Sequence, residues 1–111
     1  MSESINKRII DAVVPIVPDC VPDHYEGETE EHCTFQYSEI PESFGDDSPE
    51  TIRYMIQLHY YAPSGLNTLT IRKALRRSIH GAGFTYPSVE NASDELCQHY
   101  VLEFEDMDGE V

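Results

Sequence analysis

The chain has 111 residues, a length that fits one domain and leaves no room for two. It carries 21 acidic residues against 7 basic ones, a net charge of −14, and such a chain repels nucleic acid and anionic membrane surfaces. Its apolar runs are only a few residues long, far below the roughly 20 that span a bilayer, so neither direct nucleic-acid binding nor membrane insertion is expected.

The first half of the chain predicts a helix, a linker, a strand and a loop. Isoleucines and valines recur at helical spacing over residues 2–14, and two prolines end that helix. An acidic, proline-containing linker over 18–32 follows, and alternation of apolar and polar residues predicts a half-buried strand over 33–38. Residues 39–50 hold two prolines, a glycine and five acids, a composition typical of a long polar loop.

The second half predicts a long strand, a helix and two further strands. Strict alternation over 51–61 gives the strongest strand, and an apolar stripe predicts a helix over 67–80 that glycines end. A short strand at 84–86 and a last strand at about 97–105 follow. The acidic tail 106–111 is expected to be frayed.

The two faces of the strand 51–61 differ in character. One face carries apolar and aromatic residues: Ile52, Tyr54, Ile56, Leu58 and Tyr60. The other face is amphipathic: Arg53, Met55, Gln57, His59 and Tyr61. Either another subunit partly covers this second face, or it is an ordinary solvated face.

The order of elements (helix, strands, helix, strands) favours an α+β domain that takes in all of residues 1–111. We predict an antiparallel sheet of about four strands with two helices packed on one face. The linker 18–32 and the loop 39–50 are the irregular parts of this arrangement.

Basic residues concentrate on the predicted helix 67–80, which holds four of the seven: Arg72, Lys73, Arg76 and Arg77. Their i,i+4 spacing predicts one broad exposed face. They are either cations at the C-terminal end of a solvated helix, where the macrodipole favours them, or a docking surface for an acidic partner. Another copy of the chain supplies such acids in its 39–50 segment, at Glu42, Asp46 and Asp47, and these seven residues are the candidate subunit interface.

Four residues with metal-binding side chains lie close together in the sequence: Cys20, His24, His32 and Cys33. Their spacings match no zinc pattern, and the sequence has neither a nucleophile elbow nor a phosphate-binding glycine loop. We therefore expect no catalytic residue, no cofactor and no metal, and a protein that is not an enzyme. The odd number of cysteines and the lack of a visible signal peptide favour a reduced, cytosolic setting.

Several stretches in chain order resemble the small tail-completion and tail-terminator-like proteins of long-tailed bacteriophages and their prophages. The resemblance covers nearly the whole chain and rests on packing patterns rather than on a catalytic signature. Strong acidity and the segment 18–32 depart from the family. The matching stretches are NKRIIDA at 6–12, TFQYSE at 34–39, YMIQLHYY at 54–61, LRRSIHGAGF at 75–84 and HYVLEF at 99–104.

The resemblance implies a structural α+β subunit that forms a ring, commonly sixfold, at the head-proximal end of a phage tail. There it would end tube polymerisation and contact the tail-tube and head-connector proteins. It also implies a location in the host cytoplasm during assembly and then in the virion tail. The net charge supports a different alternative, a small acidic inhibitor that mimics DNA and binds a host DNA-binding protein.

Overall fold

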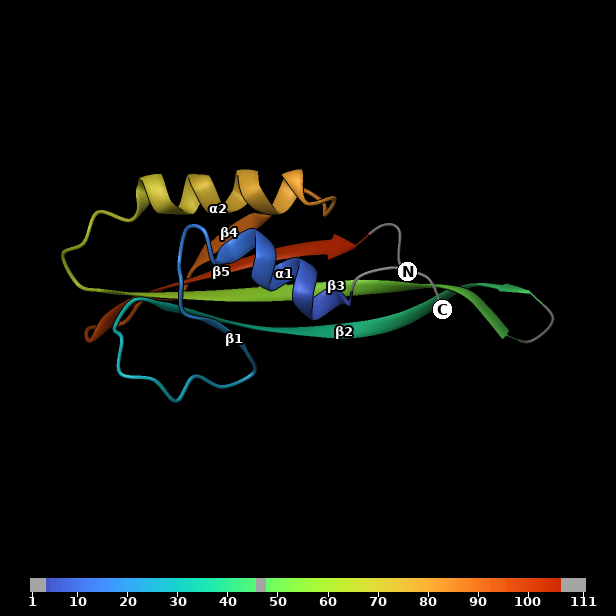
Figure 1. Cartoon of the computed structure of the whole chain (residues 1–111), viewed down its shortest axis with the longest axis horizontal. Coiled ribbons are helices and arrows are strands. Elements are labelled where there is room, and N and C mark those ends of the chain that lie inside the picture. Colours follow the sequence, from blue (N-terminus) through green and yellow to red (C-terminus); the bar gives the residue numbers. More distant parts are fainter. Residues whose placement is uncertain (1–3, 46–47, 107–111) are drawn as a thin grey trace.

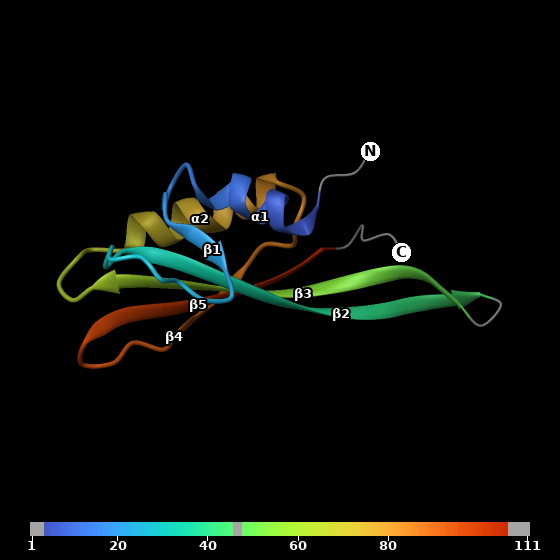
Figure 2. The same ribbon diagram turned by 60° about the horizontal axis from the view of Figure 1, so that its bottom comes forward.

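In the part of the chain that the structure describes, five strands form one sheet, and two helices lie on the same face of it (Figures 1 and 2). The structure, a computed structural model, describes residues 4–45 and 48–106. Its elements are α1 (Ile5–Val13), β1 (Cys20–Pro22), β2 (His32–Gly45), β3 (Ser48–Pro63), α2 (Leu69–Gly81), β4 (Ser88–Asn91) and β5 (Cys97–Asp106).

The sheet has the order β1-β2-β3-β5-β4, and every neighbouring pair is antiparallel except the parallel pair β1–β2. The predicted α+β class, with two helices on one face, is confirmed, and the described residues contain one strand more than the four expected. Antiparallel sheets commonly pack one face on the core and leave the other face open, and this sheet does so.

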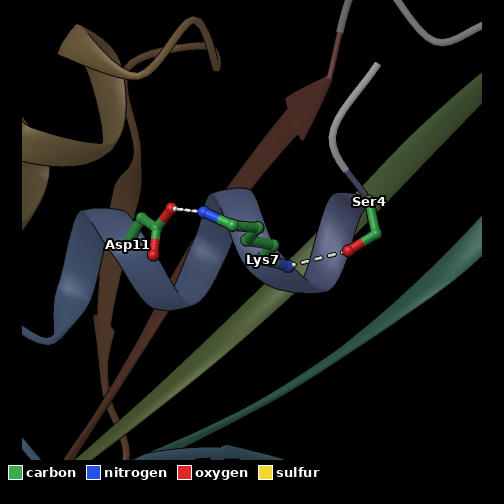
Figure 3. Close-up of polar contacts among 3 residues, drawn as sticks. All are labelled: Ser4, Lys7 and Asp11. Carbon is green, nitrogen blue, oxygen red and sulfur yellow. Dashed lines mark hydrogen bonds and ion pairs between the residues drawn. The ribbon is translucent and has the colours of Figure 1, made fainter. Parts of the chain in front are cut away.

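Helix α1 begins with a side-chain cap and carries a surface ion pair. The main-chain N–H of Lys7 donates to Ser4 Oγ over 3.2 Å, which satisfies one of the free donors of the first turn (Figure 3). Lys7 Nζ lies 2.6 Å from Asp11 Oδ2, one helical turn away. The opposite side of the helix buries Ile9, Ala12 and Val13, as the helical spacing predicts.

Helix α2 packs beside α1 and buries Leu75 and Ile79. Ser78 Oγ joins the two helices by donating to the main-chain oxygen of Ala12 over 2.6 Å. The chain turns away just after the helix at Gly83, whose φ of +100° is one that side chains with a Cβ rarely adopt. The predicted stop at the glycines after position 80 is therefore confirmed.

The core lies between the helices and the helix-facing side of the sheet. At its centre, Phe35 of β2, Leu58 of β3 and Leu102 of β5 are direct cross-strand neighbours, and all three are buried. Tyr60 is buried in the next row, where its hydroxyl donates to Glu31 Oε2 over 2.6 Å. Burial, followed by this hydrogen bond to a carboxylate, raises the pKa of Tyr60.

Strands β2 and β3 continue beyond the rest of the sheet as a two-stranded ribbon, which we call the arm: residues 40–45 and 48–53. Among the described residues, β5 pairs with β3 as far as Asp106, opposite Tyr54, and none of them pairs with the arm as a third strand. Figure 1 shows the arm reaching past both helices, and the molecule measures 54 × 25 × 25 Å. The polar loop predicted over 39–50 is therefore wrong for the described residues, which are strand up to Gly45 and again from Ser48.

The direction in which the nitrogen of Pro41 points explains how strand β2 accommodates a proline. The N–H of Cys33 donates to Asp19 of the β1 side, and the carbonyl of Phe35 accepts from Asp23 on that side. Alternation along β2 then turns the nitrogen of Pro41 outward as well, away from β3. Because that nitrogen carries no hydrogen, the β2–β3 ladder loses no bond, and proline is tolerated at such edge positions.

Three smaller expectations also differ from the structure. The linker 18–32 contains β1, which pairs through only three residues with Cys33–Phe35. The strand predicted at 84–86 is reduced to a single bridge from Phe84 to Asp106, and the edge strand β4 lies a few residues later. Asp106, the first residue of the tail that was expected to be frayed, ends β5 and is only 3% exposed.

Asp106 is held by a residue from the other end of the chain. Arg8 Nη1 of α1 lies 2.7 Å from Asp106 Oδ2, and its Nη2 donates to the main-chain oxygen of Ala82 over 3.3 Å. The same guanidinium stacks 4.4 Å from the centre of the Phe84 ring. Arg8 thereby ties α1, the end of α2 and the end of β5 together.

Candidate interaction surfaces

The four basic residues of α2 divide into two pairs with different surroundings. Arg72 stacks 4.2 Å from the ring centre of Tyr100, and Arg76 lies 4.9 Å from that of Tyr86. Both guanidinium groups also donate hydrogen bonds within the chain, to Thr68 Oγ1 and to the main-chain oxygen of Pro87. The prediction of one exposed face bearing all four is therefore wrong, because Arg72 and Arg76 pack against other parts of the chain.

Lys73 and Arg77 are the exposed pair. At 100° per residue they lie on the side of the helix opposite Leu75 and Ile79, so they point away from the sheet. No ion pair or hydrogen bond joins either cation to another of the residues that the structure describes. This half of the predicted basic surface is open to a partner.

The acidic half of the predicted interface lies on the arm. Glu42 belongs to β2, and its Oε1 is 3.2 Å from Nε of Arg53 on β3, so a neighbouring cation already offsets this carboxylate. Arg53 also lies 4.0 Å from Glu105 through its Nη1. Asp46 and Asp47 lie outside the described residues.

The face of the sheet opposite the helices carries a row of stacked rings. Tyr61 of β3 lies between His32 of β2 and His99 of β5, with ring centres 4.8 Å and 4.3 Å away. Tyr25, from the segment before β2, continues the stack at 4.1 Å from His32. These rings form one end of the open face, and the arm extends from the other end.

His59 and His99 make a direct contact next to this stack. Nδ1 of His59 lies 2.8 Å from Nε2 of His99, a distance at which one ring nitrogen must donate and the other accept. Burial lowers the pKa of His59. Burial and then the neighbouring His59 lower the pKa of His99, with Asp94 opposing this effect.

The histidine pair predicts an acid-sensitive contribution to folding. Because the folded-state pKa of each ring lies below the ordinary 6.5, this contribution is fully present above about pH 6.5. This contribution is lost as the pH falls through 6.5 toward the lowered pKa values of the two histidines in the folded state. We expect the urea midpoint of the native chain to fall more between pH 7.5 and pH 5 than that of an H59Q/H99Q variant. Equal pH dependence of the two proteins would contradict this.

A shallow hollow of about 570 Å³ lies over the open face between β3 and the segment that precedes β4. Met55 and Tyr86 supply its apolar parts, and both are largely exposed. Carboxylates of Glu103 and Glu105 lie on the same strand two residues apart, and hence on the same face. The hollow thus combines an apolar surface, an aromatic ring and negative charge, which suits a basic, partly apolar group.

Of the cysteines and histidines of the first half, Cys20 and Cys33 are neighbours in the paired strands β1 and β2, but the histidines do not join them. His32 lies in the stack on the open face, whereas Cys33 lies on the helix-facing side and is buried. Burial raises the pKa of Cys20 to about 12 and also raises that of Cys33, which disfavours the thiolate that binds metals. Among residues 4–45 and 48–106, no group of three metal-binding side chains comes together.

Sequence reasoning missed the ring stack and the histidine contact. Alternation did place His59 and Tyr61 on one face of the predicted strand, and that was the available signal. The contacts depend on the registers His32↔Tyr61 and Tyr61↔His99, which pair residues about 30 to 40 positions apart. A single sequence gives no measure of that register.

Comparison with known proteins gives no relative: no family model and no curated protein matches this chain. In the described part of the chain, neither helix has the length and apolar character needed to cross a membrane.

Proposed function

We propose that this chain is a structural subunit that associates with further copies of itself, as a tail-completion or tail-terminator-like protein of a long-tailed bacteriophage or prophage. The arm is the observation that carries the proposal. An isolated two-stranded hairpin is at best marginally stable in water, and in the part of the chain that the structure describes two strands extend beyond β5 and both helices. A neighbouring subunit that packs against the arm would explain such an extension.

The surfaces of the body are consistent with a structural role. The open face of the sheet carries exposed apolar residues such as Met55, and α2 presents two exposed cations, Lys73 and Arg77, that pair with none of the residues the structure describes. These features lie on different sides of the molecule, so contacts between copies would be heterologous and build rings or filaments. In a phage, the further partners would be the tail-tube and head-connector proteins.

A shortened arm tests the proposal. Ile40 and Arg53 face each other as a hydrogen-bonded pair, by the alternation that turns Pro41 outward, so an Asn-Gly turn can replace residues 41–52 between them. We expect the native chain to associate in sedimentation velocity and the shortened chain to remain monomeric. The free energy of unfolding should change by only about 1 kcal/mol, because none of the arm residues 40–42 and 51–53 is buried.

Two outcomes bear on the alternatives. An E42Q/D46N/D47N variant keeps the strands of the arm and removes the three acids of the candidate interface, so it separates a role of the strands from a role of these acids. A native chain that stays monomeric at every concentration and salt, alone and with a tail-tube protein, would contradict the proposal. If that monomer instead binds a purified DNA-binding protein in competition with DNA, the acidic mimic is supported.

A further inference from the structure

The exposed side of α2 has the pattern of a docking surface. Leu69, Lys73 and Arg77 follow one another at four-residue spacing, so they form a stripe along the helix. The leucine is 48% exposed, and the two cations have no ion pair or hydrogen bond within the described residues. A stripe with one apolar and two basic side chains fits a surface that offers an apolar group and two acids.

The open face of the sheet offers those groups. Met55 is 43% exposed there, beside the carboxylates of Glu103 and Glu105 on the neighbouring strand. Glu103 is exposed, and within the described residues the one cation that pairs with Glu105 is Arg53, at the long distance of 4.0 Å. Because of the strand rise, these two acids are about 7 Å apart along β5.

The two surfaces match in charge and in spacing. Residues four apart on a helix have Cβ atoms about 5–6 Å apart, close to the 7 Å between the two acids. We propose that α2 of one copy docks on the open sheet face of the next copy, with Lys73 and Arg77 paired to Glu103 and Glu105. This inference rests on the proposed self-association and names the surfaces through which it occurs.

A second copy is the occupant that the charges favour. Two chains of net charge −14 repel at long range, but at about 0.15 M salt this repulsion is screened beyond about 8 Å. Contacts between adjacent opposite charges then decide the outcome. The donor stripe and the acceptor face lie on opposite sides of one molecule, so each copy can use both at once.

Charge reversal on each surface tests the contact. At about 0.15 M salt, K73E/R77E and E103K/E105K are each expected to weaken self-association about tenfold or more, measured by sedimentation velocity. The variant that combines all four reversals restores complementary pairs and the native net charge, so it should associate within a few-fold of the native chain. Charge-removing K73Q/R77Q should show a smaller loss.

Controls separate this contact from general charge effects and from the arm. E26K/E28K, in an exposed segment, changes the net charge by the same four units as E103K/E105K and should not weaken association. If neither reversal weakens association, the proposed interface is overturned while self-association stands. If D46K/D47K, and not E103K/E105K, restores the association of K73E/R77E, the proposed interface is overturned and α2 binds the acids of the 39–50 segment instead. A native chain that never associates overturns the proposed function as well.

Discussion

Replacing Arg8 by alanine is expected to lower the free energy of unfolding by about 3 kcal/mol, measured by urea denaturation at neutral pH. The side chain of Asp106 is 4% exposed and that of Arg8 25% exposed, so the substitution removes a 2.7 Å ion pair from a carboxylate that is almost fully buried. The substitution also removes the stack on Phe84 and the bond to the Ala82 carbonyl. Breaking a buried pair costs more than the pair contributes, because the remaining buried charge loses the compensation that its counter-charge supplied.

The preceding residue provides a matched control. Lys7 lies on the same helix and pairs with Asp11, but both side chains are more than half exposed. Lys7→Ala should therefore cost less than about 1 kcal/mol. Since Asp106→Asn keeps the shape of the side chain, a double-mutant cycle with Arg8→Ala isolates the coupling between the two residues. A loss in R8A no larger than that in K7A would contradict this role.

Leu58→Ala should lower the free energy of unfolding by about 3–4 kcal/mol. Leu58 is fully buried in the central strand, between Phe35 and Leu102 in the neighbouring strands. Truncation removes apolar contacts and leaves a cavity that the flanking strands cannot close without breaking their ladders. Urea denaturation with unchanged m-value measures the effect.

Gln57→Ala is the control for this core substitution. Gln57 is the next residue of the same strand and faces the open side, where it accepts a hydrogen bond from Gln36 over 3.2 Å. Its truncation should cost only about 0.5–1 kcal/mol. Comparable losses at positions 57 and 58 would mean that the open face is covered in solution, and would contradict the description of that face as open.

Strong periodicity made most of the regular elements predictable. Ile56, Leu58 and Tyr60 alternate strictly in β3, and Leu75 and Ile79 follow helical spacing in α2, so burial on one face could be read from the sequence. The arm was missed because acids and prolines suggested a loop, although an outward-facing proline is compatible with an edge strand. The exposed strand β4 has no apolar alternation to mark it.

The candidate interface was predictable only in part. Helical spacing grouped the four cations of α2, but it could not show that Arg72 and Arg76 meet Tyr100 and Tyr86. Those contacts depend on how the helix packs over distant parts of the chain. Asp106 was assigned to the frayed tail for the same reason, since its partner Arg8 is 98 positions away.

The outward nitrogen of Pro41 has a consequence for how a crowded solution of this protein behaves. Unpaired sheet edges can recruit strands from other chains and seed insoluble fibrils, and a self-associating protein brings many such edges together. In β2 the row of outward main-chain donors beyond β1 is interrupted at Pro41, so a foreign strand cannot complete a continuous ladder there. The residue thus protects the longest edge from aggregation and leaves the faces of the molecule for ordered contacts.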